Sequence, residues 1–152
     1  MIVVNNMTFG MTGGQVAPTT LQGLTTSTTP YGNTERPFDL CKLAVAAGAT
    51  FVSRWTTQRP RNCIKALKKA IRHEGFAFLE IMTQCPTYFG RRAIGSGAPV
   101  DGVQWIQDHS VPIKQASARS EEELADRFVV GTFVQKQAPV FEGSSIYEPE
   151  GC

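Results

Sequence analysis

Three short apolar runs constrain the fold of this 152-residue chain more than any other feature. They are Ile2 to Val4, Ala49 to Val52 and Phe76 to Ile81, and each is continuous rather than alternating and rich in β-branched or aromatic residues. Strands of a parallel sheet that are covered on both faces have this pattern, because neither face meets water. Helical segments separate the runs, so the sequence predicts an α/β fold with a parallel sheet and right-handed crossovers.

The two helices between these runs have recognisable ends. Pro37 suits a first helical position and Gly48 a C-terminal stop, and Pro60 and Gly75 bracket a second helix in the same way. The cations of the second helix fall largely outside its apolar stripe. This pattern favours a solvated face over a docking surface for an acidic partner.

The later part of the chain predicts smaller elements. We expect a helix across Gly102 to Asp108 and a short acidic helix across Ser120 to Ala125, where Ser120 and Glu123 form a capping-box pattern. Residues Phe128 to Val134 are predicted as a last strand, and residues 135–152 as a tail.

Composition excludes several classes of partner. The formal net charge is only +2, and no basic stripe interleaved with aromatic residues predicts nucleic-acid binding. No apolar run approaches the roughly 20 residues that span a bilayer, so we expect no membrane segment and a cytoplasmic location. The four cysteines match no metal, redox or disulfide spacing and are expected to be free thiols.

The stretch NNMTFGMTGGQ directly follows the first apolar run. Parallel sheets bind ligands at the carboxyl ends of their strands, so this position favours a site. Gly13 and Gly14 permit a backbone that points successive N–H groups into one concavity, which suits phosphate, although a tight turn explains the pair equally well. Gln15 follows Gly14, so the stretch is not a Walker loop. Amide and carbonyl oxygens beside such a turn are ligands that Mg²⁺ accepts.

Other polar residues leave alternatives open. The segment from Pro18 to Asn33 is rich in hydroxyl side chains and is either an exposed loop or the lining of a ligand site. Both histidines lie near predicted helix ends, which favours surface roles. Arg91 and Arg92 suit either a substrate carboxylate or a structural salt link.

Six segments in order carry a family resemblance. NNMTFGMTGGQ, APTT, TSTTPYGN, PFDLC, AGATFVSR and GFAFLEIMTQCPTYFGRR resemble the thiamine-diphosphate-binding beta subunit of 2-oxoacid:ferredoxin oxidoreductases. Within that family, GMTGGQ, TTPYGN and CPTYFGR are most similar to the 2-oxoglutarate branch. The resemblance implies that residues 1–112 form the C-terminal part of the thiamine-diphosphate-binding domain. Residues 113–152 would add a short helix, a strand and an extended tail.

The resemblance also implies the cofactor contacts. Asn6 would offer its side-chain oxygen, and Thr8 its backbone carbonyl, to Mg²⁺. Asn5 is not expected to be a ligand, because strand alternation points it away from its neighbour. No catalytic residue is assigned, since the carboxylate that activates the aminopyrimidine ring would come from a partner subunit. The residues expected beside the diphosphate are Gly10, Met11, Thr12 and Gly13.

Two parts of the family pattern are absent from the sequence. There is no Gly-Asp-Gly-Asp motif to supply the charged Mg²⁺ ligand, and no cysteine-rich region for a [4Fe-4S] cluster. We therefore expect the chain to be the C-terminal part of a split or truncated beta subunit that works with an alpha subunit and ferredoxin. The cluster and coenzyme A would be bound elsewhere in the complex.

The implied activity is the oxidative decarboxylation of 2-oxoglutarate to succinyl-CoA with ferredoxin as electron acceptor. One alternative is a non-catalytic assembly module or fragment of this fold. Another is an oxidoreductase for pyruvate or branched-chain 2-oxoacids.

Overall fold

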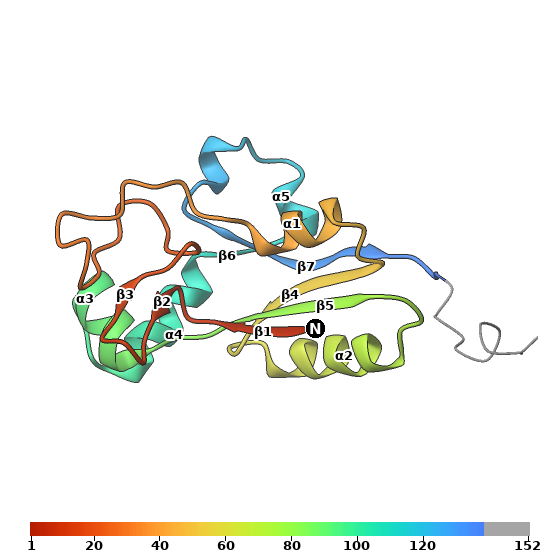
Figure 1. Ribbon diagram of the computed structural model, residues 1–152, viewed down its shortest axis with the longest axis horizontal. Coiled ribbons are helices and arrows are strands. Elements are labelled where there is room, and N and C mark those ends of the chain that lie inside the picture. The colour runs from red at the N-terminus through yellow and green to blue at the C-terminus, as the bar shows by residue number, and fades with distance from the viewer. Residues whose placement is uncertain (139–152) are drawn as a thin grey trace, which may run out of the picture.

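The computed structural model describes residues 1–138, so most of the predicted tail lies outside the described residues. A five-stranded sheet in the order β1-β5-β4-β7-β6 forms its centre (Figure 1). Three of its four strand pairs are parallel and only the β4–β7 pair is antiparallel, so the predicted α/β fold with a mainly parallel sheet is confirmed. The strands are β1 (Ile2–Asn5), β4 (Phe51–Thr56), β5 (Ala77–Met82), β6 (Ser110–Pro112) and β7 (Phe128–Gln135).

Helices α1 (Leu40–Ala46) and α2 (Pro60–Arg72) cover opposite faces of the sheet (Figure 1). The chain passes from β1 over the position of β5 to β4, and then returns to β5. Two right-handed crossovers in opposite directions place their helices on opposite faces, as observed here. Smaller elements complete the described chain: the strands β2 (Thr8–Phe9) and β3 (Gln15–Val16), a π-helical turn (Pro86–Gly90), α3 (Arg91–Ala93), α4 (Pro99–Asp108), α5 (Ile113–Ala116) and a 3₁₀ turn (Glu122–Leu124).

The predicted element ends are partly correct. Pro60 begins α2, Gly48 follows α1 with a φ of 88°, and Ser120 and Glu123 exchange the two bonds of a capping box. The prediction that Pro37 begins the first helix is wrong. Helix α1 begins at Leu40, because the Asp39 side chain accepts hydrogen bonds from the N–H groups of the first turn and caps the helix.

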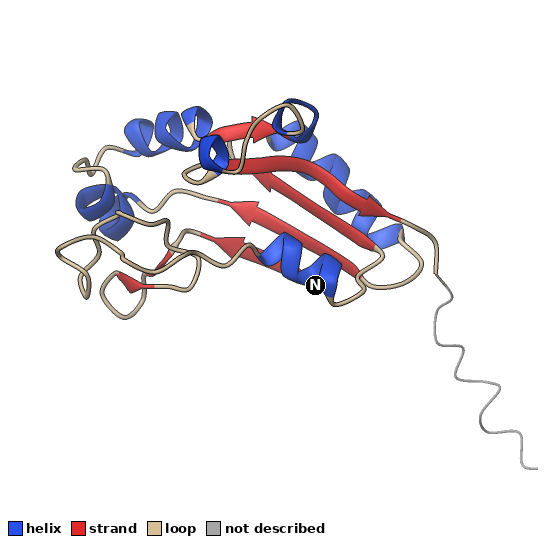
Figure 2. Cartoon of the chain, turned by 90° about the horizontal axis from the view of Figure 1, so that it is seen from above, coloured by secondary structure: helices blue, strands red, loops and turns tan. Residues whose placement is uncertain are grey.

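The carboxyl ends of β1, β5 and β4 lie at the same end of the molecule. Figure 2 shows these three arrows pointing toward the end where the long loops gather, whereas β7 points away from it. An apolar cluster lies under the loops at this end and holds them against the sheet. Its buried members are Met7, Leu21, Met82, Phe89, Phe128 and Val130.

Strand β1 departs from its predicted environment. Strands β4 and β5 are buried along nearly their whole length, as continuous apolar runs predict. In β1, however, the Val4 side chain is 67% exposed, and among the described residues the strand pairs only with β5. The prediction that β1 is covered on both faces is therefore wrong for this chain, because the face that carries Ile2 and Val4 is not covered by the described residues.

This exposed edge predicts self-association. An apolar edge strand presents unpaired N–H and C=O groups to other chains. We expect Val4→Lys to reduce the concentration-dependent association of the 152-residue chain in sedimentation velocity. The change in the free energy of unfolding should stay within about 0.5 kcal/mol, because the side chain is already exposed.

Val100→Lys is the matched control for this prediction. Val100 is 68% exposed but lies in α4, away from any strand edge. If the Val4 and Val100 variants associate equally, the edge of β1 is not the cause.

Candidate cofactor site

A tight turn follows β1 and carries the predicted ligands Asn6 and Thr8. Asn5 Oδ1 accepts the N–H of Met7 at 2.9 Å, and Met7 adopts a φ of 63°, which is uncommon for a residue with a side chain. Met7 is fully buried beneath the turn, whereas Asn6 is half-buried. The Asn6 amide lies about 3.6 Å from the place where a Gly10 side chain would begin. Asn6 therefore faces the following hairpin instead of the apolar core or open solvent.

The hairpin of β2 and β3 carries the residues predicted to contact a diphosphate. Gly13 donates its N–H to Gly10 O at 3.1 Å, and Gly14 donates to Phe9 O at 3.0 Å. These two amides are engaged inside the hairpin, as in the tight turn that is the alternative for this glycine pair, and a contact of Gly13 with a diphosphate stays a prediction. Within residues 1–138 the N–H groups of Gly10, Met11 and Thr12 have no hydrogen-bond partner. The N–H groups that are available to a ligand therefore belong to the three residues directly before the glycine pair.

Thr8 has free hydrogen-bonding capacity next to Asn6. Its hydroxyl is buried and has no partner in the described part of the chain. Thr8 N–H donates to Asn6 Oδ1 at 3.4 Å, and the N–H of its cross-strand partner Val16 donates to Thr28 Oγ1 at 3.0 Å. Since the Val16 N–H is used in this way, the Thr8 carbonyl remains available to a ligand.

The loop from Pro18 to Asn33 supports this turn. Thr20 Oγ1 donates to Met7 O, and Asn33 Nδ2 donates to Thr20 O at 2.8 Å. Thr20, Thr26 and Asn33 are buried. The alternative of an exposed hydroxyl-rich loop is therefore wrong for these three residues, whose side chains bond within the loop or to the turn, and Leu21 packs into the apolar cluster.

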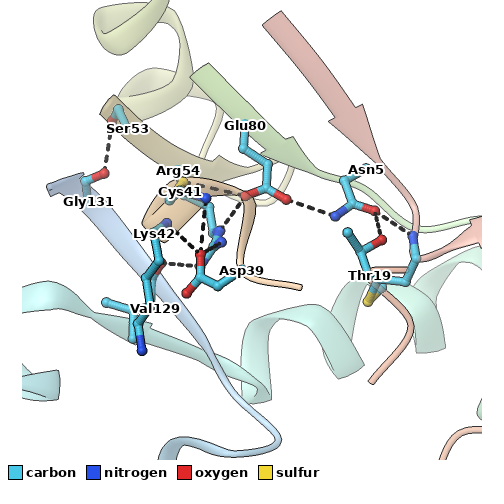
Figure 3. A network of polar contacts seen from close by, with 11 residues as sticks. Asn5, Thr19, Asp39, Cys41, Lys42, Ser53, Arg54, Glu80, Val129 and Gly131 are labelled. Carbon is cyan, nitrogen blue, oxygen red and sulfur yellow. Dashed lines mark hydrogen bonds and ion pairs between the residues drawn. The ribbon is translucent and has the colours of Figure 1, made fainter. Parts of the chain in front are cut away.

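Sequence reasoning missed a buried polar network beneath the turn (Figure 3). Arg54 and Glu80 are direct partners on β4 and β5, and Arg54 Nε donates to Glu80 Oε2 at 2.7 Å. Their exposed fractions are 6% and 1%. Glu80 Oε1 accepts Asn5 Nδ2 at 2.8 Å, which connects the ion pair to the turn. A charged residue inside each apolar run, in FVSRWT and FLEIM, was the available signal.

The same network reaches the start of α1. Arg54 also bonds to Asp39 Oδ1 at 2.6 Å, and that oxygen caps the helix. Burial acts to raise the pKa of Asp39, but the Arg54 guanidinium and the N–H of Lys42 outweigh it, so the pKa lies below its ordinary value. Burial also raises the pKa of the Cys41 thiol, which donates to Glu80 Oε2 at 3.5 Å.

The described residues fit a neutral part of a metal–diphosphate site. Asn6 Oδ1, the orphaned Thr8 hydroxyl and the Thr8 carbonyl are oxygen donors of the kind that Mg²⁺ accepts, and the free amides of the hairpin suit phosphate oxygens. Residues 1–138 contain no group of three or more His, Cys, Asp or Glu side chains placed to hold a metal ion. The turn and hairpin themselves, residues 5–16, contain no charged side chain.

The part of the chain that contains this turn matches a known protein family. The model of the thiamine pyrophosphate enzyme C-terminal TPP-binding domain matches residues 1–81, slightly more than half of the chain. The chain belongs to this family. The match includes the β1 turn, the hairpin and both members of the Arg54–Glu80 pair, and thiamine pyrophosphate is the same compound as thiamine diphosphate.

Among the proteins that are similar to this chain are subunits of 2-oxoglutarate synthases. The 2-oxoglutarate synthase subunit KorB of Methanocaldococcus jannaschii is 48% identical over 141 residues, which is 93% of this chain and 52% of the relative. The subunit of the same name from Archaeoglobus fulgidus is 55% identical over 87 residues, covering 57% of this chain and 33% of the relative. This chain thus spans about half the length, or less, of the curated relatives it matches.

A solved structure shares the fold. It is the 2-oxoglutarate:ferredoxin oxidoreductase from Magnetococcus marinus with 2-oxoglutarate, coenzyme A and succinyl-CoA bound. The TM-score is 0.74 and the identity 29%, over 97% of this chain and 51% of that one.

Both histidines have structural partners. His73 bonds to Thr50 Oγ1 at 2.8 Å, and His109 stacks on Trp105 with ring centroids 3.9 Å apart. Arg91 and Arg92 form no ion pair within residues 1–138. A basic hollow of about 540 Å³ lies at the amino end of β4, whereas Asn6 lies beyond the carboxyl end of β1. The cationic residues that line the hollow are Lys68, Lys69, Arg72 and Lys136. None of the described helices is long and apolar enough to cross a membrane.

The hairpin packing predicts different tolerances for its two glycines. A side chain at Gly14, whose φ is 83°, would begin 2.8 Å from Tyr88 Cβ, whereas one at Gly13 meets nothing within 4 Å. We expect Gly13→Ala to cost about 1–2 kcal/mol for its positive φ. Gly14→Ala should cost about 1–3 kcal/mol more for overpacking, measured by chemical unfolding.

Tyr88→Gly provides the control for this comparison, because it also removes the Cβ atom that a side chain at Gly14 would meet first. In that background the extra cost of Gly14→Ala should largely disappear. An undiminished cost would show that Tyr88 does not limit the space at Gly14.

The lowered pKa of Asp39 predicts acid sensitivity. Because the unfolded chain takes up this proton near the ordinary carboxyl pKa of about 3.9, and the folded chain only at lower pH, the free energy of unfolding falls as pH drops from about 5 through the folded pKa. Asp39→Asn keeps a good helix cap but removes the charge, so it should flatten this part of the pH profile in urea unfolding.

Asp126→Asn is the matched control. Asp126 pairs with Arg127 at the surface, with 59% of its side chain exposed, and surface ion pairs contribute little to stability. The account of Asp39 fails if the two variants show the same pH slope.

Proposed function

We propose that this chain is the thiamine-diphosphate-binding part of the beta subunit of a 2-oxoacid:ferredoxin oxidoreductase that acts on 2-oxoglutarate. The observation that carries the proposal is the Asn5–Thr8 turn. It lies at the carboxyl end of a parallel strand, inside the segment matched by the thiamine pyrophosphate family. The turn and the hairpin that follows it offer oxygen and N–H groups that have no hydrogen-bond partner among the described residues. The 48% identity to a 2-oxoglutarate synthase subunit supports this substrate.

In this proposal the chain binds and orients the cofactor. Asn6 Oδ1 and the Thr8 carbonyl hold Mg²⁺, and the N–H groups of Gly10, Met11 and Thr12 face the diphosphate. Gly13 shapes the hairpin through its bond to Gly10 O. When bound, thiamine diphosphate supplies the carbanion stabilisation that decarboxylation of a 2-oxoacid requires.

The remaining functions belong to other parts of the complex. The charged Mg²⁺ ligand, the [4Fe-4S] cluster and the coenzyme A site come from outside residues 1–138. An alpha subunit and ferredoxin are the proposed partners. The Magnetococcus marinus enzyme, which shares the fold, has coenzyme A and succinyl-CoA bound, and this supports succinyl-CoA as the proposed product.

The test uses the assembled complex, with this chain co-produced with the rest of the beta subunit and the alpha subunit. We expect 2-oxoglutarate-dependent reduction of a viologen dye, and a loss of at least about tenfold in Asn6→Ala, because a metal contact is removed. Asn62→Ala, at an exposed position of α2, should retain full activity.

Two outcomes would favour the alternatives. Activity that is unchanged in Asn6→Ala would support a non-catalytic assembly role, which the absence of an acidic metal cluster in the described residues also favours. Faster reduction of the dye with pyruvate or a branched-chain 2-oxoacid than with 2-oxoglutarate would support an oxidoreductase for that substrate instead.

A further inference from the structure

The orientation of the Asn5 amide is set by Glu80. An amide has one oxygen and one NH₂ group, whereas a carboxylate can only accept hydrogen bonds. Asn5 Nδ2 therefore has to face Glu80 Oε1, which it meets at 2.8 Å (Figure 3). This leaves Asn5 Oδ1 to accept Met7 N–H and Thr19 Oγ1, each at 2.9 Å.

Glu80 cannot turn away from this contact. Its second oxygen accepts Arg54 Nε at 2.7 Å and the Cys41 thiol at 3.5 Å. Arg54 is held in turn by Asp39 and by the carbonyl of Val129. Every polar atom of the Glu80 carboxylate thus has a partner on a different element, in a place closed to water.

The held amide supports an unfavourable backbone conformation. Met7 has a φ of 63°, a backbone conformation that is unfavourable for a residue with a side chain. The bond from Met7 N–H to Asn5 Oδ1 offsets this cost. The same conformation turns the chain so that Asn6 and Thr8 lie on the side of the hairpin.

We infer that Glu80, held by Arg54, is a positioning residue of the cofactor site: it orients the Asn5 amide, and this amide fixes the turn that presents Asn6 and Thr8 to the metal and the diphosphate. The inference rests on the proposed function. Glu80 itself touches neither group. A purely structural role would contribute to stability without affecting cofactor affinity, and the two roles are separable by reversing the hydrogen bond.

The reversal uses two isosteric substitutions. In Glu80→Gln, the new amide keeps its oxygen on Arg54 and turns its NH₂ group toward Asn5 Nδ2, so that two donors face each other. In Asn5→Asp, the new carboxylate oxygen meets Glu80 Oε1, so that two acceptors face each other. The double variant restores one donor and one acceptor with the direction of the bond reversed, and an oxygen still faces Met7 N–H.

Two readouts on the assembled complex test the inference. We expect each single variant to weaken Mg²⁺-dependent thiamine diphosphate binding about 10–100-fold, as loss of a group that orients a metal ligand does. Amide hydrogen exchange at Met7 should accelerate in both. The double variant should return the affinity to within about threefold of the unchanged complex and slow Met7 exchange again, because coupled sites are not additive.

Val52→Ala controls for general destabilisation. Val52 is fully buried in the neighbouring core cluster and has no contact with the turn among the described bonds. This variant should lower the melting temperature by several degrees without changing the affinity. The inference is overturned if Val52→Ala weakens binding as much as Glu80→Gln does, if Glu80→Gln binds normally, or if the double variant binds no better than the single ones.

The two readouts also separate this inference from the proposed function. An unchanged complex that binds no thiamine diphosphate would refute the proposed function. Met7 exchange would still decide whether Glu80 orients the turn. Normal binding in the unchanged complex with no effect of Glu80→Gln on either readout would refute the positioning role alone.

Discussion

The buried ion pair of Arg54 and Glu80 is the interaction on which the rest of the structure depends. It joins β4 to β5 at the centre of the sheet, reaches the cap of α1 through Asp39, and reaches the β1 turn through Asn5. Removing one partner would leave the other charge buried without compensation, at a cost of about 3–5 kcal/mol. Sheet, helix and candidate site are therefore coupled through a single hydrogen-bonded group.

The parallel topology explains why the candidate site lies where it does. The carboxyl ends of strands β1, β5 and β4 lie side by side, and the long loops fold over these ends onto an apolar cluster. The turn and hairpin there present only neutral groups among the described residues. Neutral oxygens hold Mg²⁺ weakly without a carboxylate, so in our account cofactor binding is a property of the assembled complex.

Local patterns in the sequence predicted the elements well. Continuous apolar runs located β4 and β5, Pro60 marked the start of α2, and the capping box at Ser120 is present. These features depend on neighbouring residues, which a sequence displays directly.

Features that depend on contacts between distant segments were missed. The Arg54–Glu80 pair arises from strand register across 26 positions, and the antiparallel pairing of β7 with β4 joins segments that are far apart in the sequence. Likewise, Gly13 was expected beside the diphosphate together with Gly10, Met11 and Thr12, but the folded hairpin uses the Gly13 N–H internally. The Asn6–Thr8 contacts to Mg²⁺ and diphosphate remain a prediction.

Our central claim is that the turn after β1 provides the neutral half of a Mg²⁺–diphosphate clamp. Anomalous diffraction from the assembled complex, with Mn²⁺ replacing Mg²⁺ and thiamine diphosphate added, tests it most directly. We predict one Mn²⁺ at ordinary coordination distance, about 2.0–2.2 Å, from Asn6 Oδ1 and the Thr8 carbonyl. A Mn²⁺ and cofactor bound elsewhere, with the Asn6 amide facing solvent, would contradict the account.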